Sequence, residues 1–426
     1  MSVPVEASAS TKWPVVQLSE VASLVRGVSY PKTDARDEPT DGYVPVLRAT
    51  NIQDARLVLE SSLVHIAKRN VAPAQLLQPG DIVVATSSGS KHLVGKSASL
   101  QSPWRGSFGA FCVAIRPQCH IDARFLALFL QSPAYWHQIS KKALGVNINN
   151  LRRGDVETLL LPLPPLTTQQ QVVAEIEKQF SRLDEAVANL KRVKANLKRY
   201  KAAVLKAAVE GRLVPTKAEL ARHEPMELWR TVTVMDVAQV ISGFTKNPKR
   251  ELFARKLPYL RVANVYADEL RLNDVEWIGV AESEVEKLLL RRGDLLVVEG
   301  NGSPDQIGRV ALWDGSIREC VHQNHLIKVR FSDEVLPKWA LTWLLSPGGR
   351  HEIEQVSSST SGLHTLSTGK VARLPFPLPP LAEQHRIVAE VDRRLSIVRE
   401  VESEVDANLK RAQVLRQATL AKAFAT

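Results

Sequence analysis

Apolar residues recur at heptad spacing in two long stretches of this chain. Each stretch keeps two apolar positions per heptad, which is the pattern of a coiled-coil seam. We therefore predict two long helices that bury this seam. The expected seam residues are Ile176, Phe180, Leu183, Val187, Leu190, Leu197 and Val204 in the first stretch, and Val391, Leu395, Val398, Val405 and Leu409 in the second.

Charged residues interrupt both seams, Lys194 and Lys201 in the first and Glu402 and Arg416 in the second. A polar seam residue commonly fixes the register of a coiled coil at some cost in stability. The first stretch also carries a basic run, which is either a solvated face or a surface for DNA phosphates or acidic partners. The run consists of Lys191, Arg192, Lys194, Lys198, Arg199, Lys201 and Lys206.

A proline-rich segment precedes each heptad stretch. It reads Leu-Pro-Leu-Pro-Pro-Leu over 161–166 and Phe-Pro-Leu-Pro-Pro-Leu over 376–381. Proline has no backbone N–H and disfavours helix in the residue before it. We expect an extended hinge that holds each long helix apart from the globular part before it.

The globular parts are repeated as well. The segment 13–27 returns in similar form as 229–243, and 77–84 returns as 290–297. The second pair contains Gly-Asp followed by aliphatic residues, which predicts a tight turn that leads into a buried strand. Segments 125–133 and 339–347 place aromatic residues at helical spacing before Ser-Pro, and they predict short amphipathic helices.

These patterns predict an α+β fold with an internal repeat, in which two similar globular domains are separated by two long helices. The expected parts are a loose tail (1–12), a first globular domain (13–160), a hinge with the central helix (161–211), a linker (212–228), a second globular domain (229–375) and a hinge with the C-terminal helix (376–426).

Composition and charge narrow the class of protein. A chain of 426 residues with 44% hydrophobic and 24% charged residues is globular and too long for one core. A formal net charge of +11 attracts polyanions, nucleic acid above all. Three cysteines fit a reducing cytoplasm rather than a disulfide framework. No apolar run approaches the roughly 18 residues of a membrane helix, so we expect a cytoplasmic protein without membrane contact.

The repeated layout resembles the specificity subunit of type I restriction-modification systems. The matching residues are Pro-Pro-Leu at 164–166 with Gln169, the same motif at 379–381 with Gln384, and Leu-Arg-x-x-Asn at 47–51 and 260–264. The resemblance covers nearly the whole chain. It implies two target-recognition domains, each reading one half of an asymmetric bipartite site in double-stranded DNA, and two helices paired antiparallel as a ruler between them.

The resemblance also implies that catalysis belongs to other subunits. This chain would dock two methyltransferase subunits and, with them, restriction and translocase subunits. S-adenosylmethionine, ATP and magnesium would bind to those partners, and this chain would bind no cofactor or metal. The DNA target itself does not follow from the resemblance, because recognition domains diverge in sequence.

Amides, hydroxyls and cations in the loops of both halves are the candidate DNA-binding residues, because such groups read base edges and contact phosphates. In the first half they are Lys32, Ser87, Ser88, Lys91, Lys96, Asn147, Asn149, Asn150 and Arg152. In the second half they are Lys246, Asn301, Ser303, Gln306, Arg309, Gln323, Asn324 and His364.

Two segments also permit other chemistry. The segment 89–97 resembles a phosphate-binding loop, but its glycines are one residue too far apart, and the second half keeps only the glycines and a cation. Cys320, His322 and His325 are a possible metal clip. We favour a surface strand with polar side chains available to base edges, because the first half has no ligands at this place.

No catalytic motif is recognisable in the sequence. The chain lacks Asn-Pro-Pro-aromatic and Asp-Pro-Pro-aromatic motifs, a complete glycine fingerprint after a strand, and carboxylates at nuclease spacing. We therefore predict no catalytic residues. A self-sufficient methyltransferase or nuclease, and a coiled-coil scaffold without a DNA role, are the alternative hypotheses.

Overall fold

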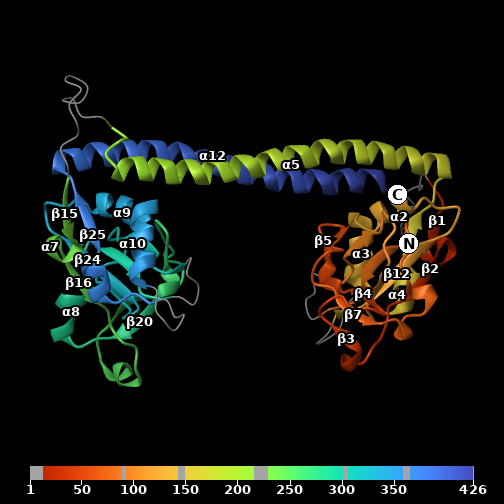
Figure 1. Ribbon diagram of the computed structural model, residues 1–426, viewed down its shortest axis with the longest axis horizontal. Helices are drawn as coiled ribbons and strands as arrows, with labels where there is room; N and C mark the ends of the chain where they lie inside the picture. The colour runs from red at the N-terminus through yellow and green to blue at the C-terminus, as the bar shows by residue number, and fades with distance from the viewer. Residues whose placement is uncertain are drawn as a thin grey trace, which may run out of the picture. The chain divides into compact units, whose positions relative to one another are not determined.

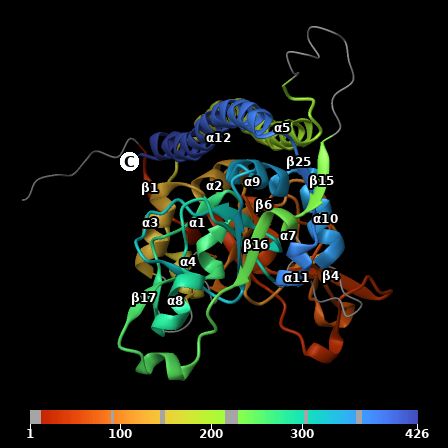
Figure 2. The same cartoon turned by 90° about the vertical axis from the view of Figure 1, so that its left-hand side faces the viewer.

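The computed structural model describes residues 13–88, 93–142, 149–214, 229–300, 306–357 and 365–425. The chain divides into two compact units. Unit 1 contains Met1–Leu190 and Ala407–Thr426, and unit 2 contains Lys191–Asp406. Each unit combines helices with several sheets (Figure 1, Figure 2), so the predicted α+β fold with an internal repeat is confirmed. The division between the units falls inside the long helices.

Two four-stranded sheets form the body of unit 1. Its strands are β1 (Val15–Gln17), β2 (Ala22–Arg26), β3 (Ala35–Arg36), β4 (Tyr43–Leu47), β5 (Ile52–Gln53), β6 (Arg56–Leu57), β7 (Val64–Ala67), β8 (Ile82–Ala85), β9 (Ser87–Ser88), β10 (Ser97–Ser99), β11 (Ser107–Phe108), β12 (Cys112–Pro117), β13 (Asn149–Asn150) and β14 (Leu160–Pro162). One sheet has the antiparallel order β10-β8-β12-β2. The other has the order β11-β4-β7-β3, in which β11 and β4 are parallel.

Unit 2 repeats this topology. Its strands are β15 (Arg230–Thr233), β16 (Ala238–Ser242), β17 (Lys256–Leu260), β18 (Val265–Tyr266), β19 (Glu269–Leu270), β20 (Glu276–Gly279), β21 (Leu295–Val298), β22 (Val310–Leu312), β23 (Val321–His322), β24 (Leu326–Phe331) and β25 (Pro375–Leu378). The order β22-β21-β24-β16 matches the first sheet of unit 1. The order β23-β17-β20, again with one parallel pair, matches three strands of the second, β11-β4-β7, and the described sheet of unit 2 has no strand in the place of β3.

Short helices cover the sheets, and two long helices continue from one unit into the other. The short helices are α1 (Leu18–Val21), α2 (Ala123–Phe129), α3 (Pro133–Lys142) and α4 (Arg153–Glu157) in unit 1, and α7 (Val234–Val237), α8 (Glu282–Leu288), α9 (Pro337–Leu345), α10 (Pro347–Ser357) and α11 (Thr368–Ala372) in unit 2. The long helices are α5 (Leu166–Val209) and α12 (Leu381–Ala423). In the described part of the chain, no helix is long and apolar enough to cross a membrane.

The helices predicted to be amphipathic, α2 and α9, are instead buried on nearly every side. Residues 125–129 of α2 are all buried, and so are residues 339–344 of α9. The reason is that α2 shares one core with both a sheet and the long helices. Ile115 of β12, Val173 of α5 and Phe424 beyond the end of α12 belong to that core.

A buried glutamine attaches each long helix to the unit in which it begins. Gln169 is 0% exposed; its side-chain oxygen accepts from Asp122 N at 2.8 Å, and its amide donates to Pro164 O at 2.8 Å. Gln384 is also 0% exposed and makes the matching bonds in unit 2 at 2.7 and 2.9 Å. Both glutamines bind backbone atoms in the loop before α2 or α9.

The proline-rich hinges are extended as expected, but they do not hold the helices apart from the globular parts. β14 pairs with β1, and β25 pairs with β15, so each hinge is a strand of its unit. The helix then packs directly on the unit, because Val173, Ile176 and Phe180 lie in the core of unit 1. The end of the other long helix completes each core. In unit 1 the ring centroid of Phe424 lies 5.1 Å from that of Phe125. In unit 2 the end of α5 contributes to the core.

The predicted seam residues are all at least partly buried. Ile176, Phe180, Val204, Val391, Leu395, Val398 and Val405 are buried, and Leu183, Val187, Leu190, Leu197 and Leu409 are half-buried.

Each charged residue that interrupts the seam has an oppositely charged partner on the other helix. The pairs are Lys194 with Asp406, Lys201 with Glu402 and Arg416 with Asp184, at 2.6, 3.2 and 2.8 Å. The first two pairs lie in unit 2 and the third lies in unit 1. Residue numbers rise along α5 as they fall along α12, so the two helix segments are antiparallel in each unit.

Gln169→Leu should lower the free energy of unfolding by about 2–4 kcal/mol, because the buried Asp122 N and Pro164 O lose their partner. Gln179→Leu is the matched control, since this glutamine on the same helix is exposed. Urea denaturation of both variants measures the difference. Equal small losses in the two variants would contradict the role assigned to Gln169.

Unit 2 buries a lysine where unit 1 has alanine. Lys328 in β24 is 0% exposed, and its ammonium donates to Lys287 O at 2.6 Å and Leu289 O at 3.2 Å. Ala114 of β12 is the equivalent residue in unit 1, because Ala114 pairs with β8 as Lys328 pairs with the equivalent strand β21. Burial, assisted by the charge of Arg330, lowers the pKa of Lys328 from 10.5 to about 8.

Stability should therefore rise with pH between these two pKa values, because the unfolded chain binds a proton that the folded chain does not. Lys328→Met removes this contribution. The unfolding free energy of wild type minus that of the variant should therefore rise by on the order of 1–3 kcal/mol from pH 7 to pH 10. Urea denaturation at several pH values measures it, with Lys249→Met on the surface as the control. An unchanged difference would contradict the lowered pKa.

Candidate nucleic-acid interface

Three chain segments meet at one edge of unit 1. They are 86–88 at the end of β8, the turn 109–111 between β11 and β12, and 149–151. Thr86 N donates to Phe111 O at 2.9 Å, Leu151 N donates to Thr86 O at 2.8 Å, and β9 pairs with β13. We call these segments the strand-end edge of unit 1.

Unit 2 builds the same edge from 299–300, 323–325 and 365–366. Glu299 N donates to His325 O at 3.0 Å, and Leu366 N donates to Glu299 O at 2.6 Å. Gly300 forms a β-bridge with Thr365, where unit 1 has the pairing of β9 with β13. Each edge thus collects segments that are far apart in the sequence.

The strand-end edge of unit 1 brings four candidate residues together. Asn150 in β13 lies opposite Ser87 in β9, and Asn149 lies opposite Ser88. Asn150 is exposed and Ser87 is half-buried. The hydroxyl of Ser87 and the amide of Asn150 are groups that can contact both base edges and phosphates.

Other candidates of unit 1 lie near this edge or elsewhere. Lys96 is half-buried and follows Gly95, whose φ of +90° favours glycine. Arg152 is exposed next to the edge, at the start of α4. Lys32 is exposed in a separate 3₁₀ turn, and no hydrogen bond among the described residues joins it to the edge. Five candidates of the two units, Lys91, Asn147, Asn301, Ser303 and His364, lie outside the described residues.

The strand-end edge of unit 2 contains Gln323 and Asn324. The side-chain oxygen of Gln323 accepts from Val262 N at 3.3 Å, and the amide of Asn324 lies 3.4 Å from His325 Nε2. Gln306 is exposed after the gap that begins at 301. Lys246 is exposed but donates to Glu276 at 2.6 Å, so part of its charge is neutralised.

Arg309 is held in place rather than free. Its guanidinium lies 4.9 Å from the ring centroid of Tyr266, and Arg271 lies 3.8 Å from the same centroid. One nitrogen of Arg309 donates to Val262 O at 3.3 Å. Arg309 follows Gly308 as Lys96 follows Gly95, so both units keep one cation after a glycine with positive φ. In the segment 89–97, which resembles a phosphate-binding loop, residues 89–92 lie outside the described residues.

Cys320 and His322 do not form the expected surface strand, which is a correction to the sequence analysis. His322 is 0% exposed and its Nδ1 lies 2.9 Å from Leu326 O. Burial lowers the pKa of His322 to about 4 and raises the pKa of Cys320 to about 12. His325 is exposed at the edge, 2.8 Å from Glu299. Among the described residues, no three His, Cys, Asp or Glu side chains are grouped to hold a metal ion.

Sequence reasoning did not identify Phe111 as a residue of the strand-end edge. It considered His325 only as a metal ligand and did not identify its contact with Glu299. Both occupy the last position of the turn before β12 or β24. The available signal was that the surrounding strands repeat while the turns differ, Gly-Ala-Phe against Gln-Asn-His. Sequence reasoning also could not show that the motif residues Asn51 and Asn264 are structural. Asn51 is buried and binds three backbone groups between Arg48 and Ser61.

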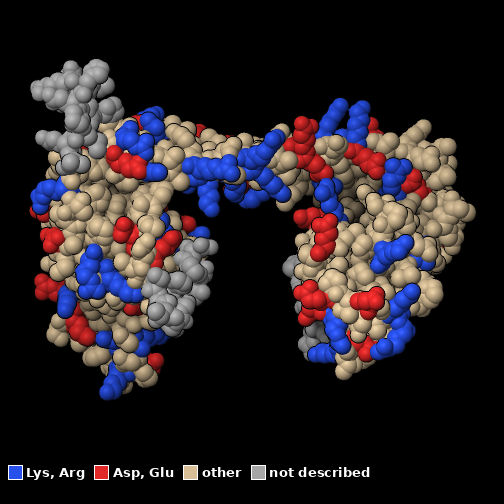
Figure 3. Space-filling view, in the orientation of Figure 1, with Lys and Arg blue, Asp and Glu red and all other residues tan. Residues whose placement is uncertain are grey.

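The long helices carry a different surface, which is basic and partly apolar. Figure 3 shows Lys and Arg gathered along the helical pair. Lys191 and Lys198 of the basic run are exposed, whereas Lys194 and Lys201 form the ion pairs described above.

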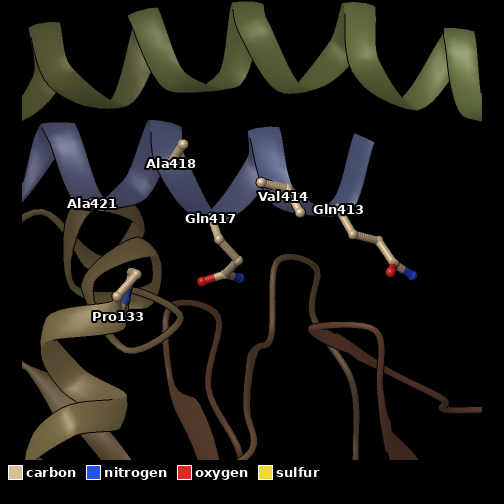
Figure 4. Close-up of a pocket in the computed structure, with 6 residues that line it drawn as sticks. All are labelled: Pro133, Gln413, Val414, Gln417, Ala418 and Ala421. Atoms are coloured by element: carbon tan, nitrogen blue, oxygen red, sulfur yellow. The ribbon is translucent and has the colours of Figure 1, made fainter. Parts of the chain in front are cut away.

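Both hollows on the helices of unit 1 are mainly apolar. A groove of about 920 Å³ runs between the helices and is lined by Leu183, Leu190 and Leu415 among others. A second hollow of about 420 Å³ lies between Pro133 and α12 (Figure 4). Val414 borders both and is 68% exposed, and Leu415 is 57% exposed. Apolar side chains gathered in this way are typical of a protein-binding surface.

Known proteins are similar to this chain over most of its length. The family model of the type I restriction modification DNA specificity domain matches twice, at residues 10–199 and 226–407. The chain is 32% identical over 418 residues to the type I restriction enzyme EcoKI specificity subunit of Escherichia coli strain K12, covering 97% of this chain and 88% of that protein. It is 33% identical over 415 residues to the StySPI specificity subunit of Salmonella potsdam, with the same coverage of 97% and 88%.

Two solved structures share the fold. One, described as the structural basis of complex assembly and conformational transition of the type I R-M system, has a TM-score of 0.71 at 21% identity and 97% coverage of both chains. The other, the HsdS subunit from Thermoanaerobacter tengcongensis, has a TM-score of 0.51 at 22% identity, also with 97% coverage of both chains.

Proposed function

This chain belongs to the family of type I restriction-modification specificity subunits, and from that premise we propose that units 1 and 2 each read one half of an asymmetric bipartite DNA site through the strand-end edge. The observation that carries the proposal is the duplication of this edge. The same backbone frame occurs in both units and presents different side chains. Two strand-end edges with different side chains suit recognition of two half-sites of different base sequence.

We propose that this chain itself is not catalytic and acts in the cytoplasm as the DNA-recognition component of a methyltransferase and endonuclease complex. S-adenosylmethionine, ATP and magnesium would then bind to the partner subunits. An enzymatic alternative would require the purified chain to methylate DNA with S-adenosylmethionine on its own. A scaffold without a DNA role would require that it fail to select any duplex.

Selection from a library of random duplexes tests the function directly. The chain, purified together with its methyltransferase partner, should enrich two short sequences separated by a gap of fixed length. Half-site centres about one helical turn, ~10 base pairs, apart allow both units to enter the major groove from one side. Enrichment of no sequence, or of one continuous sequence, would contradict the proposal.

We propose that the paired helices set the gap between the half-sites. The support is that each helix is clamped where it begins by Gln169 or Gln384 and ends in the core of the other unit. A change in helix length therefore has no flexible linker in which to be absorbed.

Insertion of one heptad into each helix, after Lys194 in α5 and before Asp406 in α12, tests the ruler. Seven residues add about 10 Å at ~1.5 Å per residue, which corresponds to about three base pairs at roughly 3.4 Å each. Duplex selection should recover the same half-sites with a longer gap. Retained binding with an unchanged gap would show that the helices do not set the spacing.

We propose that the exposed apolar side chains of the helices dock the methyltransferase subunits, one on each unit. In unit 1 they are Val414 and Leu415. In unit 2, Tyr200 occupies the position that corresponds to Leu415 in the repeat and is 44% exposed, and Ile397 and Val401 are exposed on α12. Apolar side chains of this kind, surrounded by charge, resemble the centre of a protein interface.

Leu415→Asp should reduce the number of bound methyltransferase subunits from two to one, because a charge at the centre of an apolar interface weakens binding about tenfold or more. Leu415→Asp combined with Tyr200→Asp should abolish binding. Met235→Asp on α7 is the control, since this residue is also exposed. Mass measurement by light scattering gives the stoichiometry. Two subunits bound to the double variant would place the docking surface elsewhere.

A further inference from the structure

The turn at each strand-end edge has the same backbone in both units. Five backbone hydrogen bonds hold it in each case. In each bond a backbone N–H donates to a backbone carbonyl oxygen. In unit 1, named with the donor first, the pairs are Val28 and Phe108, Gly109 and Leu47, Ala110 and Val28, Cys112 and Gly109, and Thr86 and Phe111. In unit 2 the pairs, again with the donor first, are Phe244 and His322, Gln323 and Leu260, Asn324 and Phe244, Leu326 and Gln323, and Glu299 and His325. Their lengths lie between 2.7 and 3.0 Å.

The side chains on this constant backbone are entirely different. Residues 109–111 are Gly-Ala-Phe, and residues 323–325 are Gln-Asn-His. Close packing explains why the backbone cannot vary, because a Cβ on Gly27 would lie 2.1 Å from Gly109 O, and one on Gly243 would lie 2.0 Å from His322 O. A rigid turn with unrelated side chains in the two units suits a position that determines specificity.

Phe111 is the exposed apolar residue of the edge in unit 1. It is 68% exposed, whereas Phe108 and Phe125 of the same unit are 0% exposed. Around it on the edge lie Ser87 and Asn150, which are polar. A single exposed apolar residue is ordinary on a protein surface, but this one stands on a fixed backbone among groups suited to DNA.

His325 occupies the corresponding position in unit 2. Glu299 Oε2 lies 2.8 Å from its Nδ1 and fixes the orientation of the ring. Its Nε2 lies at the side of Asn324, 3.4 Å from that amide. An oriented imidazole beside an amide offers polar contacts to a base edge, while a phenyl ring offers none.

We propose that residue 111 and its counterpart 325 each determine one base of the half-site read by their unit. Phe111 packs against the C5-methyl group of a thymine in the major groove, the only apolar group that base edges present there. His325 contacts a polar base edge. This inference rests on the proposed function and adds the residues and the class of contact.

Deoxyuridine substitution tests the contact without changing the protein. It removes the C5-methyl group and leaves the Watson–Crick edge unchanged. The complex of the chain with its methyltransferase partner is titrated with duplexes in which each thymine of the selected site is replaced in turn. Wild type should bind one of them about fourfold more weakly, the value for loss of one buried methyl group. Phe111→Ala should bind that duplex and the thymine duplex equally.

Variants of the two residues should relax different halves of the site. Duplex selection with Phe111→Ala should lose the preference at one position of one half-site, and His325→Ala should do so in the other half-site. Leu160→Ala, exposed in β14 at the hinge of unit 1, is the control and should change no position.

The outcomes separate this inference from the proposed function. If wild type selects two half-sites but no single deoxyuridine weakens binding, the thymine contact is wrong. If Phe111→Ala and His325→Ala leave every position unchanged, neither residue determines a base. If wild type selects no bipartite site at all, the proposed function itself fails.

Discussion

A buried side-chain amide at the start of each long helix is the constraint on which the rest of this structure depends. Gln169 and Gln384 bind only backbone atoms, in the hinge and in the loop before α2 or α9. A recognition domain that keeps this backbone keeps these bonds, because they depend on none of its side chains. These bonds are therefore the same in both units although the sequences of the units differ, and the proposed ruler depends on them.

The same division between constant frame and variable side chains occurs at smaller scale inside each unit. Asp81 pairs with Arg116 at 2.8 Å, and Asp294 pairs with Arg330 at 2.6 Å, so both units have the same ion pair between a buried aspartate and a half-buried arginine. The strand-end edges keep their hydrogen bonds and exchange their side chains. Stability thus depends on repeated residues, and the proposed specificity depends on those that are not repeated.

The sequence was sufficient for the repeat, the long helices and the α+β class, because heptad spacing and repeated turns are local signals. It could not show that the hinges are strands packed on the units, because proline content reports local conformation and not tertiary contact. It misplaced His322, since alternation does not reveal that a strand is covered on both faces. It missed Phe111, because an exposed aromatic residue is recognisable only when its surroundings in space are known.

Exchange of one recognition domain tests the central claim, that the units are interchangeable frames with independent readers. Residues 13–165 are placed where 229–380 stand, so that Gln384 still finds the backbone partners that Gln169 has in unit 1. Methylated sites are then mapped in cells that contain the variant and its methyltransferase partner. If the units are interchangeable, the asymmetric site should become a palindrome of the unit 1 half-site with an unchanged gap. Methylation at the original asymmetric site, or at a palindrome of the other half-site, would contradict it.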